Sequence, residues 1–319
     1  MTDIVTVGEA LLRLSPSQGD RLVTASEFDA YVGGAEANAA VAAAGVGAEA
    51  AWLSRLPDSP LGRRVVRELH AHGVRTGVSW TESGRLGTYY LERGTDPRGS
   101  EVHYDRAGST ASAMTPDDLP GAVVRDADTC FVTGIPPALS ENAQETTAAA
   151  LQTASEAGTT TAFDPNYRSK LWSADAAREV YETLLPYVDV LIVARRDAAD
   201  VLDASDKPVP MANSLAAEHG CETVVVTLGD RGALVLNDGE VHEVAAVETE
   251  TVDPIGSGDA LAGAFLAARA RGDAVDEALS LGVAAAAIKR TITGDLLVTD
   301  PDEVERLAEE GVGDGRTTR

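Results

Sequence analysis

Short, largely apolar runs alternate with longer stretches of helical periodicity over most of the chain. The apolar runs are strand candidates at residues 4–7, 50–56, 129–133, 160–163, 188–193 and 224–227. The helical stretches lie at residues 61–72, 140–157, 175–185 and 260–270. Several strand candidates contain continuous apolar runs, which are typical of parallel strands covered by helices on both faces. The pattern therefore predicts an α/β fold with a mostly parallel central sheet flanked by helices.

A different pattern interrupts this alternation in the first third of the chain. Residues 76–90 and 101–106 alternate apolar and polar positions and are broken by Gly and Pro, which indicates antiparallel strands. Residues 9–14 begin either a second strand or an excursion from the sheet.

Composition narrows the class of protein further. A chain of 319 residues could form one large α/β domain or two smaller ones. No apolar run approaches the length of about 18 residues that a membrane span needs, and the first residues show no signal-peptide pattern, so we expect a cytoplasmic protein. Cys130 and Cys221 lack C-x-x-C spacing and the five histidines lack ligand spacing, so neither disulfides nor a metal site is predicted.

The charge is unusual for a protein of this size. There are 51 acidic and 26 basic residues, a formal net charge of −25, and only three of the basic residues are lysines. The negative electrostatic field of such a chain repels nucleic acids and acidic membranes. A carboxylate-dense, lysine-poor surface resembles proteins of a salt-rich cytoplasm, and we hypothesise a halophilic host. Unfolding followed from low to molar KCl tests this, since stability that stays flat or falls with salt would contradict it.

The most informative stretch is a small-residue turn that leads into an Ala-rich helix. Gly256, Ser257 and Gly258 allow close approach of a ligand and point several amides the same way, and a helix N-terminus favours negative charge. Asp259 at this point is either an ordinary helix cap or a general base that takes a proton from a hydroxyl attacking a phosphoryl group.

A second glycine motif lies near the N-terminus, where Gly33 and Gly34 open an Ala-rich helix that contains Asn38. On its own this pair is explained by tight packing of the helix.

Together the two motifs resemble the ribokinase-like (PfkB) carbohydrate kinase family. Asp253-x-x-Gly-Ser-Gly-Asp259 is similar to its C-terminal signature, D-T-x-G-A-G-D, and Gly-Gly34-x-x-x-Asn38 is similar to its N-terminal signature, G-G-x-x-x-N. The chain departs from the family at Pro254, which lacks a backbone donor, and at Ser257.

This resemblance implies both a fold and a set of roles. It implies a single ribokinase-like domain over residues 1–319, with a small β-sheet lid contributed by about residues 10–32 and 76–110. The lid is often also a dimer surface in the family, so we expect a homo-oligomer. Asp259 would be the catalytic base, the amides of Gly256, Ser257 and Gly258 the anion hole, and Gly34 and Asn38 part of the sugar site.

The nucleotide site is predicted from the absence of two common nucleotide-binding motifs and from the same family resemblance. The sequence has neither G-x-x-x-x-G-K-[ST] nor a G-x-G-x-x-G after a strand. Thr227, Gly229 and Gly232 lie in a strand and glycine turn that alone indicates an ordinary hairpin. Members of the family have their ATP-binding loop there. The resemblance therefore implies that these three residues bind ATP together with Gly256 and Gly258, and that Mg²⁺ is a second cofactor. The family's N-x-x-E motif is altered, because Ala194 replaces its Asn and Asp197 its Glu.

The substrate side is predicted from charged and aromatic residues. Arg168 follows a buried strand, where ligands bind in open α/β sheets, although an exposed arginine that bridges to a carboxylate is the alternative. Tyr104 and Arg106 share one face of a strand, with Tyr89 on the strand before, although lid aromatics can also be interface residues.

With Gly34 and Asp295, these residues resemble the substrate set of 2-keto-3-deoxygluconate kinases, whose acid substrate suits arginine. That resemblance implies phosphorylation of O6 of 2-keto-3-deoxygluconate or its galactonate epimer. Fructokinase, ribokinase or sugar-phosphate kinase activity remains the alternative within the fold, and a non-catalytic sugar-acid sensor is the alternative outside it.

Overall fold

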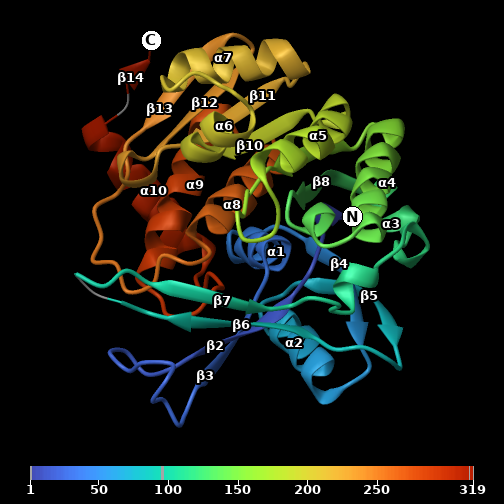
Figure 1. Cartoon of the computed structure of the whole chain (residues 1–319). Helices are drawn as coiled ribbons and strands as arrows, with labels where there is room; N and C mark the ends of the chain where they lie inside the picture. The colour runs from blue at the N-terminus through green and yellow to red at the C-terminus, as the bar shows by residue number, and fades with distance from the viewer. Residues whose placement is uncertain (1, 95–96, 316, 319) are drawn as a thin grey trace.

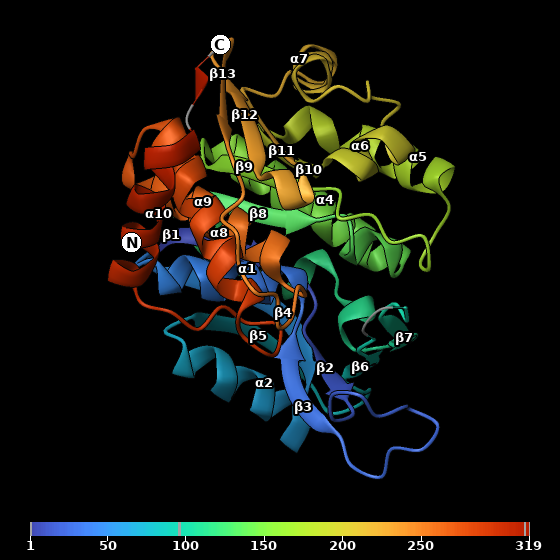
Figure 2. The same ribbon diagram turned by 90° about the vertical axis from the view of Figure 1, so that its left-hand side faces the viewer.

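The structure is a computed structural model that describes residues 2–94, 97–315 and 317–318. A ten-stranded sheet runs through the molecule, with helices on both faces, and a separate four-stranded sheet lies at one end (Figures 1 and 2). This is the α/β architecture that the hydrophobic pattern predicts, and the fold class is confirmed. No helix in the described part of the chain is long and apolar enough to cross a bilayer.

The large sheet is parallel over most of its width. Its strand order is β14, β13, β12, β11, β10, β9, β8, β1, β4, β5. Pairing is parallel from β5 to β11 and antiparallel from β11 to β14. In chain order the strands are β1 (Thr2–Val7), β4 (Ala50–Pro57), β5 (Arg75–Thr81), β8 (Ala127–Thr133), β9 (Thr160–Asp164), β10 (Val190–Ala194), β11 (Thr223–Thr227), β12 (Ala233–Asn237), β13 (Glu240–Val244) and β14 (Thr317–Thr318).

Two hydrophobic clusters cover the two faces of this sheet. One takes its helical residues from α1 (Ala35–Gly45), α2 (Pro60–Ala71), α8 (Ser257–Arg271), α9 (Val275–Arg290) and α10 (Pro301–Gly315). The other takes them from α3 (Gly121–Arg125), α4 (Glu141–Ala157), α5 (Ala174–Leu184), α6 (Arg195–Val201) and α7 (Pro208–His219). Alanine dominates α1 and α8, whose small side chains let these helices pack closely: a Cβ at Gly263 of α8 would lie 2.1 Å from the Ala39 carbonyl of α1.

The four-stranded sheet, which we call the lid sheet, has the order β3 (Asp29–Gly33), β2 (Leu11–Ser15), β6 (Gly87–Glu92) and β7 (Glu101–Asp105). Its register pairs Tyr31 with Arg13, Arg13 with Tyr89, and Tyr89 with Tyr104. Directly paired residues share a face of a sheet, so these four side chains form one row across the lid sheet.

One detail of the expected lid is wrong. Residues 76–90 were expected to form antiparallel strands, but residues 75–81 form β5, which pairs in parallel with β4 at the edge of the large sheet. Strand β6 also pairs in parallel with β2. Strand β5 is the edge strand of the large sheet and is only partly buried, so its mixed apolar and polar sequence would suit a lid strand equally well.

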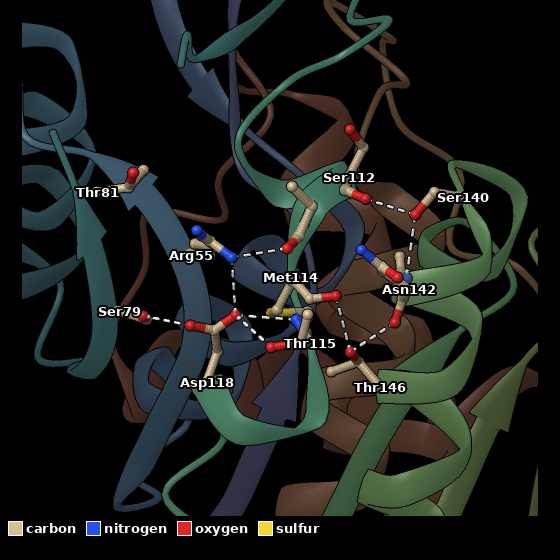
Figure 3. A network of polar contacts seen from close by, with 12 residues as sticks. Arg55, Ser79, Thr81, Ser112, Met114, Thr115, Asp118, Ser140, Asn142 and Thr146 are labelled. Atoms are coloured by element: carbon tan, nitrogen blue, oxygen red, sulfur yellow. Dashed lines mark hydrogen bonds and ion pairs between the residues drawn. The ribbon is translucent and has the colours of Figure 1, made fainter. Parts of the chain in front are cut away.

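A polar network holds the segment that returns from the lid sheet to the large sheet (Figure 3). This segment contains the short 3-10 helices η1 (Ala111–Ala113) and η2 (Pro116–Asp118). Arg55 of β4 donates to the Ala113 carbonyl at 2.7 Å and to Asp118, which also accepts from Ser79 of β5. Thr146 of α4 donates to the Met114 carbonyl at 2.9 Å. The end of the lid sheet is thereby tied to β4, β5 and α4.

Candidate active site

A cleft of about 1020 Å³ lies between the lid sheet and the carboxyl ends of the central parallel strands. Ligands of open α/β sheets bind at this edge. Every residue predicted for the substrate or the chemistry lines the cleft: Gly34, Asn38, Tyr89, Tyr104, Arg106, Arg168, Gly256, Ser257, Gly258, Asp259 and Asp295.

The turn before α8 has the geometry that its glycines predict. Gly256 has φ 85° and is the residue before the helix, which begins at Ser257. A Cβ on Gly256 would lie 2.1 Å from the carbonyl oxygen of Asp295, so only glycine fits. The first amides of a helix have no intrahelical partner, which leaves them available to an anion, although the Ser257 amide makes a 3.3 Å turn contact with the Pro254 carbonyl.

Asp259 is the third residue of α8 and does not cap the helix. Its Oδ2 accepts a hydrogen bond of 2.7 Å from Nδ2 of Asn38. Desolvation raises the pKa of Asp259, while the Asn38 hydrogen bond and the charge of Arg168 oppose the rise. A carboxylate with a raised pKa is a better proton acceptor than an ordinary surface aspartate.

The N-terminus of α1 places Asn38 against Asp259. Gly34 precedes the helix with φ 147°, and a Cβ there would lie 2.2 Å from the Glu9 carbonyl. Asn38 is buried, and its Oδ1 has no hydrogen-bond partner among the described residues. An amide oxygen that is free at the floor of a cleft can accept a hydrogen bond from a hydroxyl of a ligand.

Arg168 comes from the loop after β9. Its Nη1 donates to the carbonyls of Asn166 and Tyr167 at 3.2 and 3.1 Å, and its guanidinium is half-buried at the cleft. Asn166 has φ 41°, a conformation that Asn tolerates better than most residues. Burial and the neighbouring Asp197 raise the pKa of Asp164, at the end of β9, to about 8. The loop therefore carries a fixed cation beside Asp164, a carboxyl group that ionises with difficulty.

Arg106 enters the cleft already paired with an acid. Its Nη2 contacts the carboxylate of Glu9, which also accepts from Ser109 Oγ at 2.7 Å. All three residues are buried. Tyr104 lies beside this pair, since the Arg106 guanidinium carbon is 5.3 Å from its ring centroid. Arg106 therefore presents a guanidinium whose position is fixed by Glu9.

A second cleft of about 300 Å³ lies on the other side of the 254–258 turn. Predicted nucleotide residues Thr227, Gly229, Gly232 and Gly258 line it, whereas Gly256 lines only the first cleft. Thr227 and Gly232 flank the turn of the β11–β12 hairpin, so the hairpin reading of this stretch is correct. The remaining lining is mainly small and apolar: Ala246, Val247, Leu261, Val283, Ala286 and Ala287. This composition suits a flat aromatic ring.

No group of three or more acidic, His or Cys side chains in the described ranges could hold a metal ion. Asp197, which stands in place of the family's Glu, is buried and accepts from the Tyr167 amide at 3.1 Å and from Arg196. Protein donors therefore already engage both oxygens of the Asp197 carboxylate.

Several residues of the cleft are absent from the sequence-based prediction. Glu9, Glu36, Asn166 and Asp164 line it, and Arg13 lies behind it. Asn166 and Asp164 could have been found, since they directly follow a buried strand. Glu36 could not, because an acidic residue in the first turn of a helix is common on ordinary surfaces.

The comparisons with known proteins found carbohydrate kinases. The family described as "pfkB family carbohydrate kinase" matches residues 1–300. A 2-dehydro-3-deoxygalactonokinase of Haloferax volcanii is 52% identical over 97% of both chains. A 2-dehydro-3-deoxygluconokinase of Thermoproteus tenax is 33% identical over 96% of this chain and 94% of its own length. The crystal structure of 2-dehydro-3-deoxygluconokinase from Thermotoga maritima superposes with a TM-score of 0.91 at 33% identity, covering 97% of this chain and 100% of that one.

Proposed function

The chain belongs to the pfkB family of carbohydrate kinases, and from that membership we propose that it transfers the terminal phosphoryl group of ATP to O6 of a 2-keto-3-deoxy sugar acid. The acid is 2-keto-3-deoxygluconate or its galactonate epimer, the substrates named for the relatives from Thermoproteus tenax and Haloferax volcanii. The reaction takes place in the cytoplasm, where ATP is made.

The observation that carries this proposal is the position of the 254–259 turn between two clefts of different chemistry. Ser257 and Gly258 line both clefts, while Asp259 lines only the polar one. A phosphate chain that enters from the apolar cleft therefore meets the first amides of α8 next to the carboxylate. A hydroxyl donor in the polar cleft meets the same carboxylate from the other side.

In this arrangement Asp259 accepts the proton of the attacking O6 hydroxyl, and Asn38 orients the accepting carboxylate through its 2.7 Å hydrogen bond. The amides of Gly256, Ser257 and Gly258, at the N-terminus of α8, face the negative charge of the transferring group. Magnesium bound to ATP would neutralise the phosphate oxygens. The lid sheet covers the polar cleft and limits the access of water.

Arginine chemistry selects the acid substrate. Arg168 has a half-buried guanidinium with one nitrogen held by main-chain carbonyls, which leaves its remaining donors for a carboxylate. A neutral hexose has no group that matches this fork, and its binding would leave these donors without a charged partner from the substrate. In a chain of net charge −25, a cation kept at the cleft also raises the local concentration of an anionic substrate.

A panel of acceptors measured by ADP release in molar KCl tests the proposal. The panel contains 2-keto-3-deoxygluconate, its galactonate epimer, fructose, ribose and fructose 6-phosphate. We expect the two keto acids to give a kcat/KM at least about a hundredfold above fructose, the size expected for a lost buried charge pair. Preference for a neutral sugar or a sugar phosphate would contradict the proposal. Ligand-induced thermal shifts without ADP release would favour a binding protein, which the altered Ala194 position also suggests.

We further propose that the chain forms a homo-oligomer through the lid. Val23 and Phe28, in the segment between β2 and β3, are 88% and 40% exposed, which is unusual for large apolar side chains beside a sheet edge. Light scattering at molar KCl tests this, and a monomeric mass would contradict it.

A further inference from the structure

Arg13 lies in the middle of β2 and is completely buried, although the strand around it is apolar. Its guanidinium contacts two carboxylates from distant parts of the chain. Nη2 lies 2.7 Å from Oδ2 of Asp253, and Nη1 lies 3.0 Å from Oδ1 of Asp295. The lid sheet is therefore joined through one side chain to the two loops that flank the turn before α8.

Neighbours in the lid sheet hold Arg13 from both sides. The register pairs it with Tyr31 and with Tyr89, and its guanidinium carbon lies 5.2 Å from the centroid of the Tyr31 ring. Tyr89 donates from its hydroxyl to Oδ2 of Asp295 at 2.5 Å, and Ser15 accepts from Nε of Arg13 at 2.8 Å. Both oxygens of the Asp295 carboxylate are thus held by side chains of the lid sheet.

Asp253 holds the other end of the connection. Its carboxylate accepts from the amides of Ile255 and Gly294, at 3.3 and 3.2 Å. The first of these amides belongs to the loop that leads into α8, and the second belongs to the loop that carries Asp295. Because a Cβ on Gly256 would overlap the Asp295 carbonyl, the two loops are also in direct contact. A shift at Asp253 or Asp295 therefore moves the amides that face the phosphoryl group.

Charge balance explains why this group of residues can be buried. Arg13 and Lys289 face Asp253 and Asp295, and all four are at most 3% exposed. Lys289 donates to the carbonyls of Asp253 and Ile292, and Arg93, at 17% exposure, lies 3.7 Å from Asp253. Removal of one charge alone leaves an unpaired buried charge, which is strongly destabilising. Removal of one charge of each sign avoids that effect.

We propose that Arg13 is a positioning residue for phosphoryl transfer: by bridging Asp253 and Asp295, it fixes the substrate-facing Tyr89 and Asp295 in register with the anion-binding turn before α8. Arg13 itself does not line the cleft. The proposal rests on the proposed kinase function. According to this proposal, the lid sheet covers the sugar and also helps to position the groups that take part in phosphoryl transfer.

The test compares the intact wild-type enzyme with Arg13→Met/Asp253→Asn, which removes one buried charge of each sign. Melting temperature, kcat and both KM values are measured in molar KCl. We expect a folded protein whose kcat/KM for the keto acid falls on the order of 10²-fold, the effect expected when reacting groups are misplaced by about 1 Å. The KM for ATP is expected to stay within about threefold, because the apolar cleft does not include these residues.

Two further variants keep the result interpretable. Arg13→Lys keeps the charge but not the planar fork that bonds two carboxylates, so we expect it to fold and to lose at least about tenfold in the same kinetic constant. Arg85→Met removes an arginine at the edge of the lid sheet, whose ion pair with Asp105 is exposed, and serves as the matched control with unchanged kinetics.

The proposal would be overturned if the folded double variant or Arg13→Lys kept a keto-acid kcat/KM within about threefold of wild type. It would also be overturned if only the KM for ATP changed. If the double variant does not fold, Arg13→Lys decides the question by the same criterion. A wild-type enzyme without keto-acid kinase activity would instead refute the proposed function, so the two failures are distinguishable.

Discussion

The two clefts on either side of the 254–258 turn differ in how many charged side chains line them. The larger cleft is formed by charged and polar side chains from the lid sheet, α1, the loop after β9 and α8, and many of them are buried and paired. The smaller cleft is formed by a hairpin turn and mainly by apolar residues of α8, α9 and the segment after β13, with Asp230 and Arg290 as its charged residues. Buried and paired charges therefore distinguish the larger cleft, and we expect specificity that depends on charge to arise mainly there.

This difference determines which substitutions are expected to matter. A side chain in the larger cleft acts through hydrogen bonds and charges that have no substitute once removed. A residue in the smaller cleft contributes mostly volume, so its replacement changes affinity by a modest factor. The contrast would be supported if variants in one cleft changed the kinetic constants for only one of the two substrates. Variants that changed the constants for both substrates equally would contradict it.

The largest effect is expected for Asp259→Asn, which keeps the shape of the side chain but removes the proton acceptor. We expect kcat to fall by about 10²–10⁴-fold, the usual range for a general base, while calorimetry shows keto-acid binding within a small factor of wild type. Near-normal turnover of Asp259→Asn would refute the assigned role.

The next largest effect is expected for Arg168→Met, which removes the cation proposed to bind the substrate carboxylate. We expect the KM for the keto acid to rise on the order of 10²-fold, with the KM for ATP little changed. Arg63→Met is the matched control, since Arg63 lies on α2 in an exposed ion pair with Asp58. A keto-acid KM that is equal in both variants would show that Arg168 does not recognise the acid.

A smaller effect is expected in the apolar cleft. Ala287 of α9 lines it, and Ala287→Phe would fill part of its volume of about 300 Å³. We expect the KM for ATP to rise by about tenfold, because added volume in a shaped apolar site typically costs 1–3 kcal/mol. Ala287→Ser is the small-volume control. An increase in the KM for the keto acid instead of the KM for ATP would place the nucleotide elsewhere.

The smallest effect concerns pH and Glu36, which lines the larger cleft. Burial raises the pKa of Glu36 to about 7, although Thr133 donates to it through both its amide and its hydroxyl. Because the pKa is raised in the folded state, this group stabilises the fold fully below its unfolded pKa of about 4.3, and that contribution is lost as the pH rises through about 7.

Glu36→Gln should therefore reduce the loss of unfolding free energy between pH 5 and pH 8 by up to roughly 3 kcal/mol relative to wild type. Chemical denaturation at several pH values in molar KCl measures this, with the exposed Glu145→Gln on α4 as the control. An unchanged pH dependence in Glu36→Gln would show that the buried carboxyl does not titrate in this range.

Site residues could be predicted from the sequence where the residues of a motif are neighbours in the chain. Gly256, Gly258 and Asp259 could be predicted as a unit, because a glycine turn followed by a helix former specifies its own geometry. Gly34 and Asn38 became interpretable only beside that motif. Residues 76–81 were misassigned to the lid, because an edge strand of the large sheet and a strand of a small sheet have the same alternating pattern.

The sequence by itself determined six parallel strands of the large sheet, the helices α1, α2, α4, α5 and α8, and the two glycine turns, because backbone preferences and side-chain periodicity depend on residues that are close in the chain. Only the tertiary structure decided that Arg13 meets Asp253 and an aspartate 282 residues away, or that Asn38 meets Asp259. Such pairings leave no local pattern, since any buried cation in an apolar strand requires an anion and the strand does not specify which one. The chemistry of the larger cleft is thus a property of packing between distant segments.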